Sequence, residues 1–292
     1  MRLTAWLILS LLAVLVSASC PQAKQTGRTT APAPTPASQA GTGGATEVTS
    51  PPPPPAPVGA QFAWLPTSDR YRVAAWFWPA TGNEKSAPAV ILLHQRAKDK
   101  SSWGDMPGKL VAEGYAVIAI DLRGHGQTVD AQGRSVPLDA LRDSDYQAML
   151  NDVAAAHAYL ATQKTVDATR VAIIGASIGA NLALMYAGSD RRVRAVVALS
   201  PGLDYRSLKP LPAMPGLDKR PLFLAASKGD KASYDAILAL QQAAVKDAPV
   251  TMRAFEGQAH GTDLLRAQPG LDSTIIDGFL LNYLSPHGPP PT

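Results

Sequence analysis

The sequence predicts an α/β fold, with a mostly parallel sheet covered by helices on both faces. Short apolar runs rich in β-branched residues alternate with longer stretches whose apolar residues recur at helical spacing. Residues 89–94 and 193–199 are apolar at nearly every position, as in strands buried on both faces. Such alternation is typical of parallel strands joined by helical crossovers.

The expected strands follow from these apolar runs. A short opening strand is expected near residues 61–65. The others occupy residues 72–79, 89–94, 116–121, 170–175, 193–199, 221–226 and 250–255.

The expected helices lie at residues 109–113, 143–163, 178–188, 233–245 and 271–284. The second of these carries apolar residues at helical spacing, which indicates core packing. His157 lies in the middle of that helix, and we expect it to be a surface residue.

The N-terminus has the features of a secretory signal peptide, assigned to residues 1–19. Arg2 precedes an apolar run that is shorter than a membrane-spanning helix, and small residues follow it. Cys20, the sole cysteine, stands where that segment ends, which resembles a bacterial lipoprotein signal. The resemblance implies a lipid on Cys20 and export to the cell envelope. Cleavage after Ala18 and an uncleaved anchor are the alternatives.

Residues 20–60 form a different kind of segment from the rest of the chain. Residues 21–58 consist mainly of Pro, Ala, Thr, Ser and Gly, with five consecutive prolines at 51–55. Such a composition has too little apolar surface to fold and predicts a disordered linker. The remaining residues, 61–292, are enough for one catalytic or binding domain.

Charge and motifs exclude several classes of function. The formal net charge is +4, of which the first 60 residues carry +2. The positive charge of the domain is therefore too small to indicate nucleic-acid binding. A single cysteine cannot form an intrachain disulfide. The chain has no His/Cys/Asp cluster with metal spacing, no phosphate loop and no dinucleotide-binding turn. No metal and no cofactor is therefore expected.

Residues 175–179, Gly-Ala-Ser-Ile-Gly, lie between an apolar strand and a helix. This context makes G-x-S-x-G a nucleophile elbow, a sharp turn that presents the serine hydroxyl above the sheet. The alternative is a serine that caps a helix on a tight turn. We predict Ser177 as the nucleophile.

A serine nucleophile needs a histidine base and an acid that orients it, here in the chain order Ser, acid, His. His260 stands on a loop after the last strand, whereas His287 lies in a Pro/Gly-rich tail. Asp230 follows the strand at 221–226, and its alternative role is a helix N-cap. We predict Asp230 and His260, with Asp204 and Glu256 as alternative acids.

Acyl transfer also needs two backbone N–H donors for the developing oxyanion. One is expected from Ile178, directly after the nucleophile, and the other from the loop after the strand at 89–94. Gln95 is the predicted donor and Arg96 the alternative. His94 is expected to hold that loop, and Asp121 to bond backbone groups in the turn after the next strand.

Six segments together resemble the α/β-hydrolase superfamily, in particular compact bacterial hydrolases near the dienelactone hydrolases. They are residues 92–95, 121–126, 175–179, 200–202, 229–230 and 259–261. The resemblance covers residues 61–284 and implies a Ser-Asp-His mechanism through an acyl-enzyme. Dienelactone hydrolases use a cysteine nucleophile, so their activity is not implied. Gln95 replaces a glycine common in the family, which affects the space for substrate.

No connection between strands is long enough for a large lid. Residues 127–141 and 203–220 are the candidates to cover the site, and an apolar rim is expected from Leu208, Leu211, Met214 and Leu217. Arg96, Lys98 and Lys100 are interpreted as a solvated loop, and attraction of an anionic group on the substrate is the alternative.

The leading functional hypothesis is an envelope serine hydrolase that cleaves carboxylic esters of small molecules. A peptidase or amidase with the same three residues is the second hypothesis. A non-catalytic binding protein that retains the fold is the third.

Overall fold

The computed structural model describes residues 55–81 and 86–288. The predicted signal peptide, Cys20 and nearly all of the predicted linker lie outside these residues. In the described part of the chain, no helix is both long enough and apolar enough to cross a membrane.

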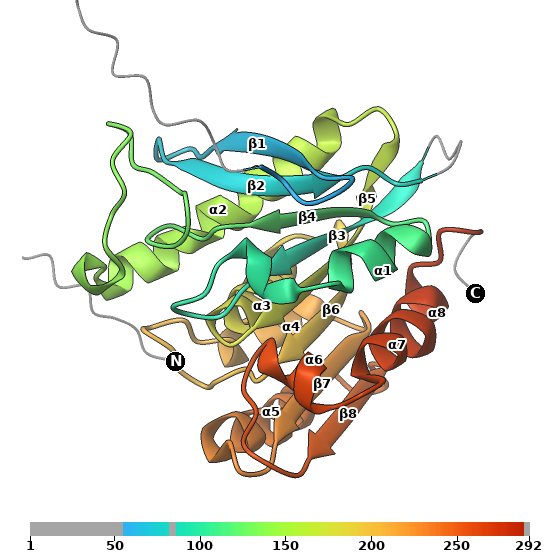
Figure 1. The fold of residues 1–292 in the computed structure, drawn as a ribbon. Coiled ribbons are helices and arrows are strands. Elements are labelled where there is room, and N and C mark those ends of the chain that lie inside the picture. Colours follow the sequence, from blue (N-terminus) through green and yellow to red (C-terminus); the bar gives the residue numbers. More distant parts are fainter. Residues whose placement is uncertain (1–54, 82–85, 289–292) are drawn as a thin grey trace, which may run out of the picture. The chain divides into compact units, whose positions relative to one another are not determined.

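The described residues form an eight-stranded sheet with the order β1-β2-β4-β3-β5-β6-β7-β8 (Figure 1). β1 pairs with β2 and β2 with β4 in antiparallel orientation, and all other neighbours are parallel. The strands are β1 (Gln61–Pro66), β2 (Arg72–Trp78), β3 (Ala87–Leu93), β4 (Ala116–Ile120), β5 (Val166–Ala176), β6 (Val193–Leu199), β7 (Leu222–Ser227) and β8 (Val250–Phe255). All eight predicted strands are confirmed, and the fold is the expected α/β architecture with a mostly parallel sheet.

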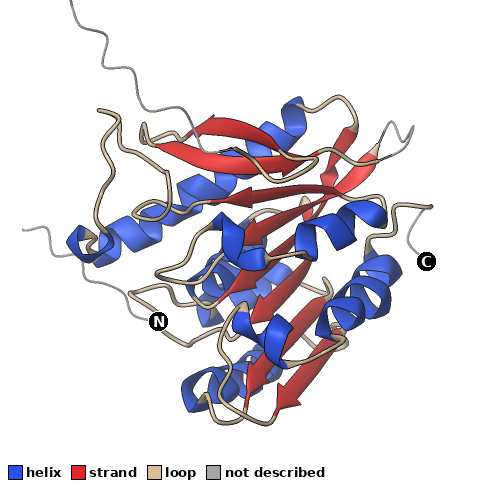
Figure 2. Ribbon diagram, viewed as in Figure 1, coloured by secondary structure: helices blue, strands red, loops and turns tan. Residues whose placement is uncertain are grey.

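Helices cover both faces of the sheet, as Figure 2 shows. One face packs against α2 (Asp143–Thr162), α3 (Ile178–Ser189), α4 (Met214–Leu217) and α5 (Lys231–Ala243). The other face packs against α1 (Met106–Ala112), α6 (Asp263–Ala267) and α7 (Leu271–Ile275). Side chains alternate between the two cores along a strand, because successive residues point to opposite faces.

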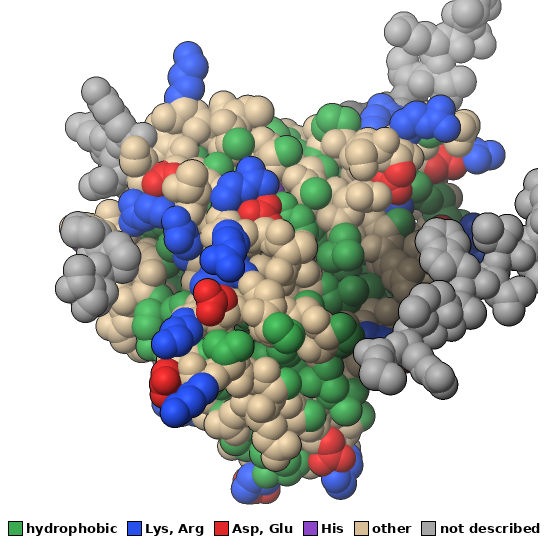
Figure 3. Space-filling model, turned by 180° about the vertical axis from the view of Figure 1, so that it is seen from behind, with side chains coloured by type: hydrophobic (Ala, Val, Ile, Leu, Met, Phe, Trp, Pro, Cys, Tyr) green, Lys and Arg blue, Asp and Glu red, His purple; other side chains and the backbone are tan. Residues whose placement is uncertain are grey.

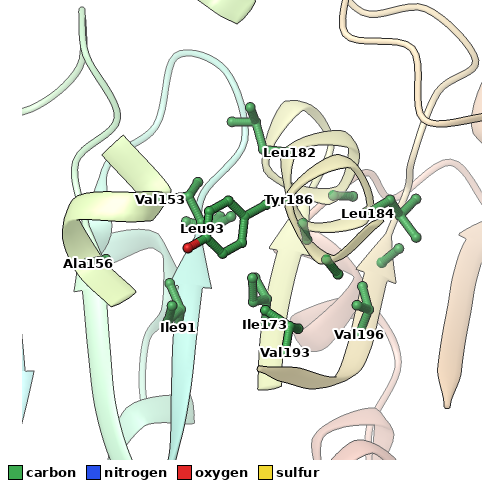
Figure 4. Packing of buried hydrophobic residues seen from close by; sticks show 14 of the residues in the cluster. Ile91, Leu93, Val153, Ala156, Ile173, Leu182, Leu184, Tyr186, Val193 and Val196 are labelled. Atoms are coloured by element: carbon green, nitrogen blue, oxygen red, sulfur yellow. The ribbon is translucent and has the colours of Figure 1, made fainter. Parts of the chain in front are cut away.

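The core on the α2–α3 face is shown in Figure 4. Ile91 and Leu93 of β3 lie beside Val153 of α2, and Ile173 of β5 lies below Tyr186 of α3. These side chains are almost fully buried. Their packing fixes α3, and therefore the turn that precedes α3, against the centre of the sheet.

The predicted C-terminal helix, expected over residues 271–284, is confirmed as one unbroken helical segment over residues 271–283. Its π-helical interior was not predicted: α7 is followed by a π-helical segment at Ile276–Leu280 and by the short α8 (Leu281–Tyr283). Short helices at α4 and α6 were not predicted. Four-residue and five-residue helices have too few periodic positions to be recognised from sequence.

Two polar residues expected at the surface are buried, so those predictions were wrong. His157 is 1% exposed and bonds the Tyr186 hydroxyl and the Ala168 carbonyl. Lys100 is 4% exposed, and its Nζ lies 2.6 Å from Asp121 Oδ2. Partners distant in sequence satisfy both side chains, which makes their burial possible.

The predicted apolar rim at residues 203–220 is also corrected. Leu208, Met214 and Leu217 belong to the core instead. α4 turns Met214 and Leu217 inward against α3, and Leu208, which precedes α4, is also fully buried.

The elbow between β5 and α3 depends on close backbone contacts. A Cβ atom on Gly175 would clash with the carbonyl of Gly179. A Cβ atom on Gly179 would clash with the carbonyl of Leu93 at the end of β3. The two glycines therefore allow β5, α3 and β3 to approach one another at the position of Ser177.

The substitution Gly179→Ala is expected to lower the free energy of unfolding by about 1–3 kcal/mol, as typical for overpacking. The added methyl group would push α3 away from the end of β3. Denaturant unfolding followed by circular dichroism measures the change. Gly108→Ala is the control, because a Cβ atom on Gly108 in α1 meets no atom within 4 Å. Equal stability of the two variants would contradict the proposed crowding.

Candidate active site

Ser177 occupies the turn between β5 and α3 in a strained conformation. Its φ is 55° and its ψ is −115°, outside the regions that non-glycine residues prefer. The Ser177 N–H donates to the Leu199 carbonyl at 2.9 Å, and its carbonyl accepts from the N–H groups of Ala180 and Asn181. These bonds hold the residue in place. The serine starts α3 but makes no side-chain cap bond, so its hydroxyl is not used as a helix cap.

Asp230 and His260 form a close pair at the same edge of the sheet. His260 Nδ1 lies 2.6 Å from Asp230 Oδ2. Because a carboxylate accepts at Nδ1, the ring carries its proton there and its Nε2 is left as an acceptor. Asp230 stands at the N-cap position of α5 without making a cap bond, so its carboxylate serves the histidine.

The alternative residues are engaged elsewhere. Asp204 accepts from the Ser207 N–H and lies 3.4 Å from Lys209 Nζ. The carboxylate of Glu256 is largely exposed and pairs with Lys228. His287 is exposed near the C-terminus. Among these candidates, Asp230 is the carboxylate that contacts His260.

Ser177 and His260 line one small pocket of about 300 Å³. The remaining lining residues are Arg96, Ile178, Asp204, Tyr205 and Arg206. In the described part of the chain, Ser177 and His260 are not hydrogen-bonded to each other. Contacts of this kind are often loose without substrate and tighten when it binds.

The pocket also contains backbone groups suited to bind an oxyanion. Ile178 is the first residue of α3, where N–H groups lack an intrahelical partner. The backbone N–H groups of Gln95 and Arg96 make no hydrogen bond to another described residue. Arg96, the alternative to Gln95, is the one of the two that lines the pocket.

His94 holds the loop that carries these groups. Burial, and secondly the neighbouring His125, lower the pKa of His94 to about 3, so the ring is neutral. Its Nε2 accepts from the Leu122 N–H at 3.1 Å, which leaves Nδ1 to donate to the Gln95 carbonyl at 2.8 Å. The predicted structural role of His94 is confirmed.

Asp121 has the predicted backbone-binding role in the neighbouring turn. Its carboxylate accepts from the N–H groups of Lys100 and Gln127, each at 2.8 Å, and from Lys100 Nζ. The same residue therefore ties the loop after β3 to the loop after β4.

The side chain of Gln95 has a function that sequence reasoning missed. It turns away from the pocket and contacts the loop of His260. Gln95 Oε1 accepts from the N–H and the hydroxyl of Thr262, at 2.6 and 2.8 Å, and Nε2 donates to the His260 carbonyl at 3.4 Å. A Cβ atom on Gly261, whose φ is 61°, would clash with this amide.

Two serines complete the support of the same loop. Ser200, directly after β6, accepts from the Gly261 N–H at 2.9 Å. Ser227, the last residue of β7, donates to the Ala259 carbonyl at 2.8 Å. Together with Gln95, these serines stand at or just beyond the ends of buried strands. That position is the sequence signal from which their role could have been found. We call Gln95, Ser200 and Ser227 the histidine-loop cradle.

A metal site is not formed by the described residues. Within 55–81 and 86–288, no group of three His, Cys, Asp or Glu side chains could hold a metal ion.

The chain belongs to the family with the α/β hydrolase fold, whose family model matches residues 88–243. An esterase from Pyrococcus furiosus has a similar structure, with a TM-score of 0.60 and 18% identity over 77% of this chain and 93% of the esterase. An acetyl xylan esterase from Paenibacillus sp. R4 has a TM-score of 0.61 and 16% identity over 78% of this chain and 90% of that enzyme.

Among curated proteins, the quorum-quenching protein AidA of Acinetobacter baumannii is 30% identical over 153 residues, which are 51% of this chain and 45% of AidA. An uncharacterized protein of Mycobacterium tuberculosis is 31% identical over 137 residues, which are 47% of this chain and 44% of that protein. The chain thus spans less than half the length of these curated relatives.

The variant Gln95→Met tests the histidine-loop cradle. Removing the amide leaves the buried N–H and hydroxyl of Thr262 without an acceptor, which costs about 1–3 kcal/mol. Faster amide hydrogen exchange is expected at Gly261 and Thr262. Thr262→Ser, which keeps both donors, is the control and is expected to exchange as the wild type does. Unchanged exchange in Gln95→Met would show that the amide does not hold the loop.

Proposed function

We propose that the protein is a serine hydrolase that cleaves carboxylic esters of small molecules through an acyl-enzyme. The observation that carries this proposal is the Asp230–His260 pair, at 2.6 Å, beside a strained serine in one pocket. A non-catalytic binding protein would have no need for a serine at φ 55° or for an oriented histidine. Strain of this kind is concentrated at functional sites.

In the proposed mechanism, Ser177 Oγ attacks the ester carbonyl carbon while His260 Nε2 takes its proton. Asp230 holds the ring and stabilises the imidazolium. The N–H of Ile178 and an N–H of the loop at 95–96 bind the developing oxyanion. His260 then protonates the leaving alcohol. In the second half of the reaction, water attacks the acyl-enzyme while His260 takes its proton. The acid is released when His260 returns a proton to Ser177 Oγ.

Pocket size and structural similarity support ester substrates of modest size. The pocket of about 300 Å³ is at the lower end for small-molecule sites. The two solved structures of similar fold described above are those of esterases. Amide cleavage by the same residues is the second candidate, and it would demand more of His260 because an amine leaves only when protonated.

Substitution of Ser177 or His260 by alanine is expected to abolish hydrolysis of a short-chain aryl ester almost completely. The double variant is expected to lose little more than either single variant, because members of a triad act as a unit. A fluorophosphonate probe followed by peptide mass spectrometry is expected to place the adduct on Ser177. Near wild-type turnover in Ser177→Ala, or an adduct elsewhere, would refute the proposal.

Asp230→Asn distinguishes the orienting acid from its alternatives. A loss of turnover on the order of 10⁴-fold is expected, as in a related triad in which the histidine tautomer is no longer fixed. Asp204→Asn and Glu256→Gln are the matched controls, since their carboxylates have other partners. A larger loss in either control would reassign the acid.

We also propose that the chain is exported and held at the envelope membrane by a lipid on Cys20. The sole cysteine at the end of the signal-like segment supports this. The intact mass of membrane-extracted protein is expected to correspond to a chain that begins at a lipid-bearing Cys20. A soluble chain that begins at Ser19 would contradict the proposal.

A further inference from the structure

A cluster of cationic side chains lies at the amino ends of β5, β6 and β7, at the edge of the sheet opposite to Ser177. Two adjoining cavities, of about 550 and 330 Å³, occur there. They share Arg194, Lys219 and Arg220 as lining residues. Because β6 spans seven residues, this edge is about 20 Å from the catalytic edge.

The charge around the two cavities is strongly one-sided. Asp218 is the one carboxylate among their lining residues, against the five cations Arg170, Arg191, Arg194, Lys219 and Arg220. In Figure 1 the parallel strands β5, β6 and β7 begin on the right, so in the reversed view of Figure 3 this edge is on the left, where Lys and Arg side chains gather. We call these five residues the basic cluster.

Neutral carbonyl groups hold Arg220 and Arg194 of the basic cluster in place. Arg220 donates to the carbonyls of Ala187 and Gly216, each at 2.6 Å, and to that of Val193 at 2.7 Å. Arg194 donates through Nε to the Thr169 carbonyl at 3.0 Å. Carbonyl acceptors orient a guanidinium group without neutralising its charge.

The nearby carboxylates do not compensate for this charge. Asp190 is bound to Arg192, which lies outside the cavities, at 2.6 Å. Asp218 is 3.9 Å from Arg191, and both side chains are mostly exposed. Burial, together with the neighbouring Arg191, lowers the pKa of Arg220. The local potential therefore favours an anion.

The larger cavity also has an apolar side. Pro221, Tyr283 and Leu284 line it beside the cations. A ligand that fills it needs a negative group and an adjoining apolar part. A phosphodiester with its glycerol and first acyl carbons has this combination, whereas inorganic phosphate does not.

We propose that the basic cluster binds the headgroup of an anionic phospholipid. The phosphodiester would lie between Arg194 and Lys219, with the glycerol against Tyr283. A membrane bound at this edge would leave the pocket of Ser177 open on the opposite side. The site would thus orient the domain on the membrane whether or not Cys20 carries a lipid.

Vesicle co-flotation of the full chain tests this proposal. Phosphatidylcholine vesicles with an increasing share of phosphatidylglycerol are compared, so that any contribution of the N-terminal segment is the same at each composition. Binding is expected to rise with phosphatidylglycerol. In Arg194→Glu/Lys219→Glu this rise is expected to fall tenfold or more, since each basic residue near an anionic surface contributes appreciably.

Arg253→Glu is the matched control, because Arg253 is also an exposed strand arginine bonded to a backbone carbonyl but does not line either cavity. It is expected to keep the full rise. Ester hydrolysis is expected to be unchanged in the double variant, and Ser177→Ala to bind vesicles as the wild type does. Vesicle binding and ester hydrolysis are thus lost in different variants, so the lipid-binding proposal and the hydrolase proposal are tested independently.

Two outcomes would overturn the proposal. One is binding that does not depend on phosphatidylglycerol, or a dependence that survives in the double variant. The other comes from calorimetric titration with short-chain phosphatidylglycerol and with inorganic phosphate. Equal affinity for the two, lost together in the double variant, would show a site for the free anion rather than for the lipid.

Discussion

The candidate site depends on the contact between the backbones of β3, β5 and α3. Gly179 lies against the Leu93 carbonyl, and Gly175 lies against Gly179, with no room for a side chain at either position. Ser177 has to turn between them at φ 55°, and such strain costs of the order of 1–3 kcal/mol. The packed surroundings and the bond of Ser177 to Leu199 offset that cost. The same contact brings the loop after β3 next to the start of α3.

The position of His260 depends on a different kind of interaction. Its loop has no regular secondary structure, so its backbone groups need partners from elsewhere. The histidine-loop cradle provides them from the ends of three strands. Because all three side chains are nearly or fully buried, a lost bond would leave a buried polar group unsatisfied. The sheet thereby determines where the imidazole lies, although the histidine itself is on a loop.

Local sequence patterns were sufficient for the strands and for placing Ser177, Asp230 and His260 at one edge of the sheet. Ser177, Asp230 and His260 each follow a recognisable apolar strand, and parallel strands bring such positions to one edge of the sheet. The patterns failed where burial depends on distant partners. Nothing near His157 in sequence indicates the hydroxyl of Tyr186, and nothing near Gln95 indicates Thr262.

The loop after β3 shows the same limit in another form. Sequence reasoning assigned Gln95 to the backbone donor and treated its side chain as an obstacle to substrate. The structure directs that side chain to the histidine loop and places Arg96 along the pocket. The direction of the Gln95 side chain is decided by its hydrogen-bond partner, Thr262. That partner is 167 residues further along the chain, so no local pattern indicates it.

The two edges of the sheet differ in how their cations are balanced. Near the edge that carries Ser177, buried cations face carboxylates, as in Lys100–Asp121 and Arg123–Asp152, each at 2.6 Å. At the amino edge, Arg220 and Arg194 face carbonyls. A cation paired with a carboxylate has little field beyond its neighbourhood, whereas one held by carbonyls keeps its full charge. The two ends of the parallel strands therefore differ: buried cations near the Ser177 edge are paired with carboxylates, whereas cations at the opposite edge are held by neutral carbonyl groups.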